Sequence, residues 1–177
     1  MKNKAIYSLF AAGVLMLFAC CNSHSSNEQE ITMEGHYSYQ HAFNYDMDGN
    51  HFDVHETGTM DFFADSTALD SARQVYSVIY ADGNTGTLIF NYISPSHWHL
   101  NGDTLHFAGL NGLFRMELVE GDSAGIELAQ KIIKAYSGSN TYEYLFHLDT
   151  LTADLLKWSF TYRDGHSDTW EFHRVTE

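Results

Sequence analysis

Two histidines separated by a single residue, His97 and His99, have the spacing in this sequence that best suits metal chemistry. Alternate residues of a strand point to the same face, so the two imidazoles could bind zinc or copper together. Further ligands could come from four histidines earlier in the chain: His36, His41, His51 and His55. If Trp98 and Leu100 face the core instead, both histidines face solvent. We therefore assign no metal site and no cofactor from the sequence, and keep metal binding as a hypothesis.

A second candidate ion site is the segment 44–49, which reads Asn-x-Asp-x-Asp-Gly. Calcium loops place oxygen ligands at alternate positions and glycine at the sixth position, as here. The twelfth position, however, is His55, and the nearest acid, Glu56, comes one residue late. The flanking residues alternate as strands do, whereas a calcium loop is flanked by helices. The segment therefore predicts an Asp-rich hairpin turn.

Two familiar enzyme patterns are missing from this sequence. It contains no His-Glu-x-x-His and no glycine-rich phosphate loop. The only two cysteines are Cys20 and Cys21, so the rest of the chain has no disulfide, thiolate metal site or cysteine nucleophile. Acid pairs such as Asp46 and Asp48 could do acid–base work, but nothing marks a raised pKa there. We predict that the protein is not an enzyme and assign no catalytic residue.

Charge excludes some partners. The formal net charge is −14, and removal of Lys2 and Lys4 with the leader brings it near −16. Affinity for nucleic acid comes largely from Lys and Arg, so nucleic-acid binding is excluded. The charge could steer cations toward the protein, or it could be an ordinary solvated acidic surface.

Residues 1–19 have the pattern of a secretory signal peptide. A short basic start at Lys2 and Lys4 is followed by an apolar run too short for a comfortable transmembrane helix. The run ends in Leu17-Phe18-Ala19-Cys20, which resembles the lipobox of bacterial lipoproteins. That resemblance implies acylation of Cys20, which would become the mature N-terminus; the alternative is an ordinary cleaved signal with two stray cysteines.

Residues 20–30 are polar, without apolar period, and predict a flexible tether between an acyl anchor and a domain. Two or three acyl chains anchor a protein stably in a bilayer. The predicted location is the cell envelope, with the lipid in the outer membrane. No early acidic cluster follows Cys20, which favours the periplasmic face over the cell surface.

The elements that would position any site are strands. In the segment 85–107, apolar residues alternate and turn signals stand at Pro95 and at Asn101-Gly102-Asp103, which predicts three short antiparallel strands. The same pattern recurs along residues 31–177, with a bulge predicted at Gly58 and a polar connection over 64–72. Apolar residues at helical spacing predict one helix over 123–137. We predict a single all-β domain over residues 31–177: an up-and-down antiparallel barrel of eight to ten strands.

Four short segments carry a resemblance to a known group: Gly35-His36-Tyr37, Gly58-Thr59-Met60-Asp61-Phe62, the run 98–105, and Trp170-Glu171-Phe172-His173-Arg174. Together they resemble the lipocalin-like domains of small lipoproteins of gut-type Gram-negative bacteria. Gly35-x-Tyr37 is similar to the lipocalin Gly-x-Trp. The resemblance implies a calycin-like barrel in which Arg174 packs on Tyr37, and it implies no particular ligand.

The sequence therefore predicts a lipid-anchored envelope lipoprotein whose lipocalin-like barrel binds a small apolar molecule in its mouth. Aromatic strips along several strands could line such a cavity or fill a core, so no ligand-binding residue is assigned. One alternative is a structural or interaction lipoprotein whose partner is another envelope protein. A second alternative is binding of zinc or copper through the histidines.

Overall fold

The computed structural model describes residues 32–110, 112–138, 143–163 and 165–176. The predicted signal peptide (1–19) and the tether that begins at Cys20 (20–30) lie outside the described residues. Within the described ranges, no helix is both long enough and apolar enough to cross a membrane.

The described chain forms nine strands and one helix. In order they are β1 Gly35–Met47, β2 Asn50–Phe62, β3 Thr67–Ile79, β4 Thr85–Asn101, β5 Thr104–Gly109, β6 Arg115–Gly121, α1 Gly125–Gly138, β7 Glu143–Leu151, β8 Leu155–Thr161 and β9 Ser167–Arg174.

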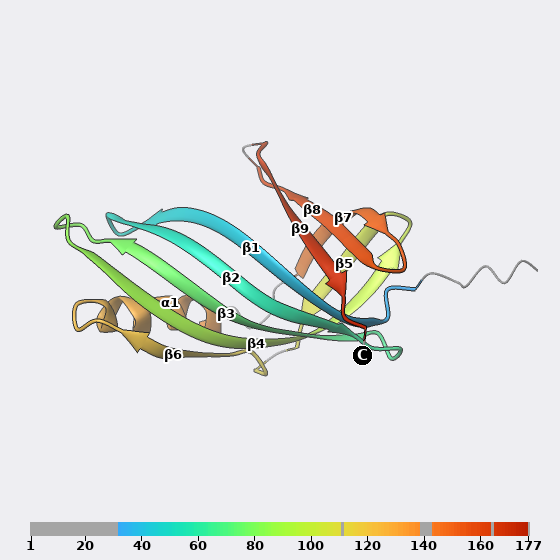
Figure 1. Ribbon diagram of the computed structural model, residues 1–177, viewed down its shortest axis with the longest axis horizontal. Helices are drawn as coiled ribbons and strands as arrows, with labels where there is room; N and C mark the ends of the chain where they lie inside the picture. The colour runs from blue at the N-terminus through green and yellow to red at the C-terminus, as the bar shows by residue number, and fades with distance from the viewer. Residues whose placement is uncertain (1–31, 111, 139–142, 164, 177) are drawn as a thin grey trace, which may run out of the picture. The chain divides into compact units, whose positions relative to one another are not determined.

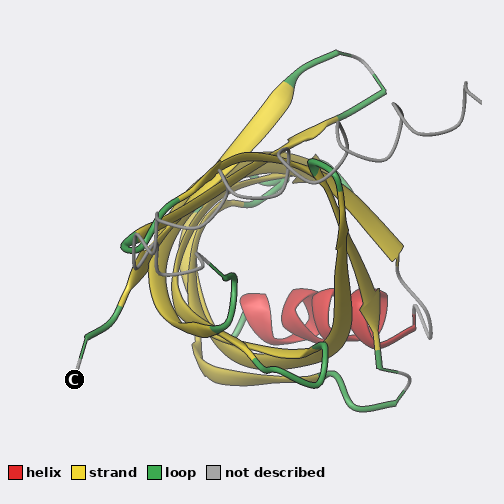
Figure 2. Cartoon of the chain, turned by 90° about the vertical axis from the view of Figure 1, so that its right-hand side faces the viewer, coloured by secondary structure: helices red, strands yellow, loops and turns green. Residues whose placement is uncertain are grey.

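Eight of these strands close into an antiparallel barrel, which Figure 2 shows in a view along its interior. The sheet order is β3-β2-β1-β9-β8-β7-β5-β4, and a further pairing of β3 with β4 closes the ring. Strands that are consecutive in the chain are neighbours in the barrel, with one interruption. Between β5 and β7 the chain forms β6, which pairs with β4 outside the ring of eight strands, and then α1. The predicted all-β, up-and-down barrel is confirmed.

The barrel is closed firmly at one end and parts at the other. β1 pairs with β2 along its whole length, from Gly35 to Met47, but with β9 only over residues 37–39. Beyond that short ladder the two strands diverge, and Figure 1 shows β7, β8 and β9 leaving the long curved strands β1–β4 at an angle. We call the end of the barrel where β1 and β9 part the wide end, and the end where they pair the narrow end.

Pro95 does not break the chain into two strands, contrary to the prediction. β4 runs without interruption from Thr85 to Asn101 and pairs with β3 across the proline. On its other edge β4 pairs with β6 up to Ile93 and with β5 from Ser96 onward. The Pro95 carbonyl points to that edge, where it accepts a bond from the Leu110 N–H at 2.9 Å. The missing proline N–H therefore falls in the gap between two partner strands, where no ladder bond is lost.

The predicted bulge at Gly58 is also absent, because β2 keeps an unbroken register with both neighbours. The reason for glycine is space. A Cβ atom at this position would lie 2.9 Å from Cε1 of the Tyr39 ring and 2.7 Å from Cβ of Ala72. Gly58 therefore lets the Tyr39 side chain pass across β2 toward the barrel interior.

Residues 67–72, predicted as part of a polar connection, are the first half of β3. Their inward positions are Ala68, Asp70 and Ala72, two small residues and an acid, so the usual alternation of large apolar residues is missing. The barrel accepts this composition because β3 passes beside a polar part of the interior.

The predicted helix over 123–137 is confirmed as α1, with its start two residues later. Oδ1 of Asp122 accepts a hydrogen bond from the Gly125 N–H at 2.8 Å and so caps the first turn. Leu128, Ala129 and Ile132 are buried against β4 and β6, where they complete a second apolar core beside that of the barrel.

At the narrow end Arg174 packs on Tyr37, as the resemblance implied. Its guanidinium lies 4.8 Å from the centre of the Tyr37 ring, and Nη2 donates to the Tyr37 hydroxyl at 2.6 Å. The same group donates to the backbone carbonyls of Ala153 (2.6 Å), Glu34 (2.7 Å) and Thr32 (3.1 Å). One side chain thus ties β9 to the chain before β1 and to the turn before β8.

Candidate ligand-binding site

The two histidines considered for metal binding lie on the outer surface of β4. Trp98, between them, points inward, and its indole N–H donates to the Thr67 carbonyl at 2.9 Å. His97 and His99 are exposed, and the His99 ring stacks on His106 of β5 at 4.2 Å between ring centres. Across the described residues, no three His, Cys, Asp or Glu side chains converge closely enough to hold a metal ion.

The Asp-rich segment before Gly49 is a hairpin turn, as predicted. Asp48 and Gly49 have φ angles of 53° and 79°, the left-handed values that a tight two-residue turn between β1 and β2 requires. Oδ1 of Asp46 lies 2.7 Å from Nδ1 of His51 across the turn, so this carboxylate is committed to a side-chain partner.

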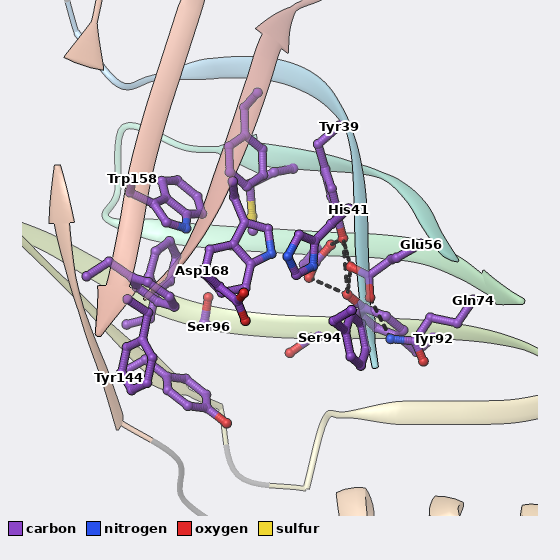
Figure 3. A pocket seen from close by; sticks show the side chains of 18 of the residues that line it. Tyr39, His41, Glu56, Gln74, Tyr92, Ser94, Ser96, Tyr144, Trp158 and Asp168 are labelled. Atoms are coloured by element: carbon purple, nitrogen blue, oxygen red, sulfur yellow. Dashed lines mark hydrogen bonds between the residues drawn. The ribbon is translucent and has the colours of Figure 1, made fainter. Parts of the chain in front are cut away.

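A cavity with a volume of about 360 Å³ lies inside the wide end of the barrel. That volume falls in the range of sites that hold small molecules. Most of its wall is aromatic, and the polar side chains of Glu56 and Gln74 lie close together in one part of it (Figure 3). The lining residues are Tyr39, His41, Phe43, Glu56, Met60, Asp70, Gln74, Tyr92, Ser94, Ser96, Phe107, Phe114, Met116, Tyr136, Tyr144, Phe146, Trp158, Phe160, Tyr162, Asp168, Trp170 and Phe172.

Two carboxyl groups form the polar side of the cavity, Glu56 on β2 and Asp70 on β3. The Tyr39 hydroxyl lies 2.6 Å from Oε1 of Glu56 and 2.8 Å from Oδ1 of Asp70. The Tyr92 hydroxyl bridges the same acids, at 3.0 Å from Glu56 and 2.8 Å from Oδ2 of Asp70. Nε2 of Gln74 donates to the second oxygen of Glu56 at 2.5 Å. Figure 3 shows Tyr39, Glu56, Gln74 and Tyr92 turned toward one another in this part of the cavity.

This cluster has fewer protons than oxygen–oxygen contacts. The two phenols and two carboxyls make five such contacts, since the hydroxyls of Tyr39 and Tyr92 also lie 3.1 Å apart. Each phenol carries one proton, so two protons serve five contacts when both acids are ionised. A proton on a carboxyl group would fill a further contact, and the remaining lone pairs of these oxygens could accept from a donor in the cavity.

Asp70 is the carboxyl group that retains a proton. Burial disfavours its charged form, and the negative charge of Glu56 adds to the effect, which together raise the pKa of Asp70 to about 7. The hydrogen bonds from Tyr92 and Tyr39 act in the opposite direction. Near neutral pH the Asp70 carboxyl group therefore exchanges between its neutral and its charged form.

His41 stands where β1 and β9 part. Its ring lies 4.5 Å from that of Trp170 on β9 and 5.5 Å from that of Phe43 on β1. Burial lowers the pKa of His41, while the charges of Glu56 and Asp168 raise it. Because burial is the largest of these effects, the imidazole is neutral at pH 7 and forms part of the aromatic wall.

Sequence reasoning identified the aromatic strips but missed the acids. Glu56 and Asp70 appeared there only as a residue beside a rejected calcium loop and as part of a polar connection. The sequence did contain a signal for Glu56 in the alternation of strand residues. Glu56 alternates with Val54 and Phe52, so it occupies an inward position. An acid at an inward position of a barrel strand indicates a polar interior site.

Fold and cavity together define the class: an eight-stranded antiparallel barrel with an internal cavity that has aromatic walls and an acidic side. In comparisons with known proteins, no family model matches this chain and no curated protein matches it.

Proposed function

We propose that this protein binds a small molecule inside its barrel while an acyl chain on Cys20 holds it at the outer membrane. The observation that carries the binding proposal is the cavity of about 360 Å³. Interiors of folded proteins are normally packed to the density of organic crystals, so a space of this size with aromatic walls suits a ligand. Rings of Phe146, Phe160 and Trp170 present apolar faces to it.

The binding proposal predicts uptake of N-phenyl-1-naphthylamine, a neutral fluorescent probe, by the chain produced from residue 20 with Cys20→Ser. Ser94 lines the cavity, so a bulky indole in the variant Ser94→Trp would occupy the space, and affinity should fall by about tenfold or more. Fluorescence titration measures both affinities. The matched control is Ser38→Trp, on the outer face of β1, which should bind as the parent does.

Absence of probe binding by the parent chain would favour the alternative of an interaction protein that holds no ligand. Equal binding by the parent and Ser94→Trp would place the probe outside the cavity and would also contradict the proposal.

The anchoring proposal rests on the lipobox-like end of residues 1–19 and the polar tether of residues 20–30. The unaltered protein should partition into the detergent phase of a Triton X-114 separation, because its acyl chains prefer an apolar medium. Cys20→Ser should move to the aqueous phase, and the neighbouring control Cys21→Ser should stay with the detergent. An unchanged distribution of Cys20→Ser would contradict acylation at this residue, and protection of the protein from protease on intact cells would support the periplasmic face.

A further inference from the structure

We propose that the ligand is an organic cation, a primary amine with an apolar body, whose ammonium group binds between Glu56 and Asp70. This inference rests on the proposed function, since it assumes that the cavity holds a ligand. It goes further by naming the chemical class of that ligand and the two residues that select it.

The charge of the cavity lining favours a cationic ligand. Among the described residues that line the cavity there are three carboxyl groups, on Glu56, Asp70 and Asp168, and neither Lys nor Arg. Two of these acids share one hydrogen-bonded cluster inside the barrel, where a charge without a counterion is costly. A cationic ligand supplies that counterion, whereas an anionic ligand would add a like charge to the pair.

The cluster of two phenols and two carboxyl groups is short of hydrogen-bond donors. Tyr39 and Tyr92 supply two protons for the five oxygen–oxygen contacts of the cluster. An ammonium group brings three N–H donors and accepts none, so it can donate to carboxyl and phenol oxygens that have more lone pairs than the cluster has protons. A ligand that carries only acceptors would offer these oxygens no hydrogen.

The wall of the cavity around the two acids is aromatic. The Tyr92 ring is stacked with Phe114 at 6.0 Å, and the Tyr39 ring lies 4.9 Å from Phe172. Cations are attracted to aromatic faces, and an apolar body packs against them as well. A largely aromatic wall with two clustered acids matches a molecule with one charged end.

Three indole compounds of similar size test the proposal: tryptamine, which is cationic, tryptophol, which is neutral, and indole-3-propionate, which is anionic. Isothermal titration calorimetry on the Cys20→Ser chain should give about 10- to 100-fold tighter binding for tryptamine than for tryptophol, as a charge-assisted hydrogen bond provides. Indole-3-propionate should bind most weakly. In Glu56→Gln and in Asp70→Asn, the ratio of the first two affinities should fall by about tenfold.

The matched control is Glu117→Gln, an acid on the exposed face of β6, which should keep the full preference for tryptamine. Equal binding of tryptamine and tryptophol, or a preference that survives Glu56→Gln, would overturn the inference. If the neutral naphthylamine probe still binds in that case, the proposed function stands and only the ligand class is wrong. If neither the probe nor any indole compound binds, both proposals fail.

Discussion

Asp70→Asn is expected to remove a decline in stability that the unaltered protein shows as the pH rises toward neutrality. The carboxyl group has a pKa of about 7 in the folded protein and 3.8 as its ordinary value. Between these two values the folded protein holds a proton that the unfolded chain has released. The free energy of unfolding therefore falls as pH rises through this interval, by about 4 kcal/mol for the full shift. Asparagine has no proton to lose, so the variant lacks this contribution.

The physical origin of the effect is the cluster described above. Glu56 on β2 places a like charge beside Asp70, while Tyr39 on β1 and Tyr92 on β4 donate to its ionised form. Burial outweighs the two hydrogen bonds, so ionisation of Asp70 destabilises the folded state. This direction is opposite to that of a surface carboxylate such as Asp65, whose pKa is lowered by hydrogen bonds from Thr67.

Urea unfolding, followed by tryptophan fluorescence from about pH 4.5 to about pH 8.5, measures the effect as a difference between the two proteins. The comparison removes contributions that both share, including those of His41 and the surface acids. Asp53→Asn is the matched control, because this acid is exposed on the outer face of β2 and should follow the unaltered protein. Parallel curves for the unaltered protein and Asp70→Asn would contradict a raised pKa at Asp70.

Arg174→Ala should destabilise the barrel by about 3 kcal/mol, because it removes four hydrogen bonds and a cation–π contact together. Three backbone carbonyls lose their charged donor, and the Tyr37 hydroxyl loses its partner. Arg174→Lys should recover little of the loss, since one ammonium group lacks the planar, divergent donors that reach these acceptors. Thermal or denaturant unfolding measures the change.

The control for this prediction is Arg73→Ala, an exposed arginine on the outer face of β3, with an expected change within about 0.5 kcal/mol. Gly35→Ala provides an independent check, because a Cβ atom at Gly35 would collide with Nη1 of Arg174, and the φ angle of 148° is unfavourable for alanine. Gly35→Ala should therefore lower the free energy of unfolding by displacing the Arg174 guanidinium. If Arg174→Ala and Arg73→Ala had the same free energy of unfolding, the contacts of Arg174 would not stabilise the barrel.

The elements that sequence reasoning predicted well were those whose inward residues are large and apolar. The second half of β3, with Tyr76 and Val78 buried, and the helix with Leu128 and Ile132 show the expected periods, because the cores they face are apolar. Pro95 was misjudged for a topological reason. Whether a missing N–H costs a ladder bond depends on which strand lies opposite, and that arrangement is not a local property of the chain.

The acidic side of the cavity was missed for a related reason. Strand prediction uses apolar alternation, and a barrel that keeps polar residues inside interrupts that alternation at the site itself. Asp70 stands between Ala68 and Ala72, so this segment resembled a polar connection. Gly58, which makes room for the Tyr39 ring, resembled a bulge. The contacts of Tyr39 and Tyr92 join residues 17 to 53 positions apart in the chain, and no local pattern predicts them.

The pairing of β1 with β9 has a consequence for how the chain folds. The hydroxyl of Tyr37 and the guanidinium of Arg174 are separated by 137 residues, so the ring closes only after the last strand has been made. Contacts between distant residues are costly in loop entropy and form slowly. Hairpins β1–β2, β2–β3 and β3–β4 are local and can form as the chain emerges, so we expect barrel closure to be a late event in folding. A chain shortened before β9 would retain its hairpins but would have no closing strand, and its unpaired edges would be open to aggregation.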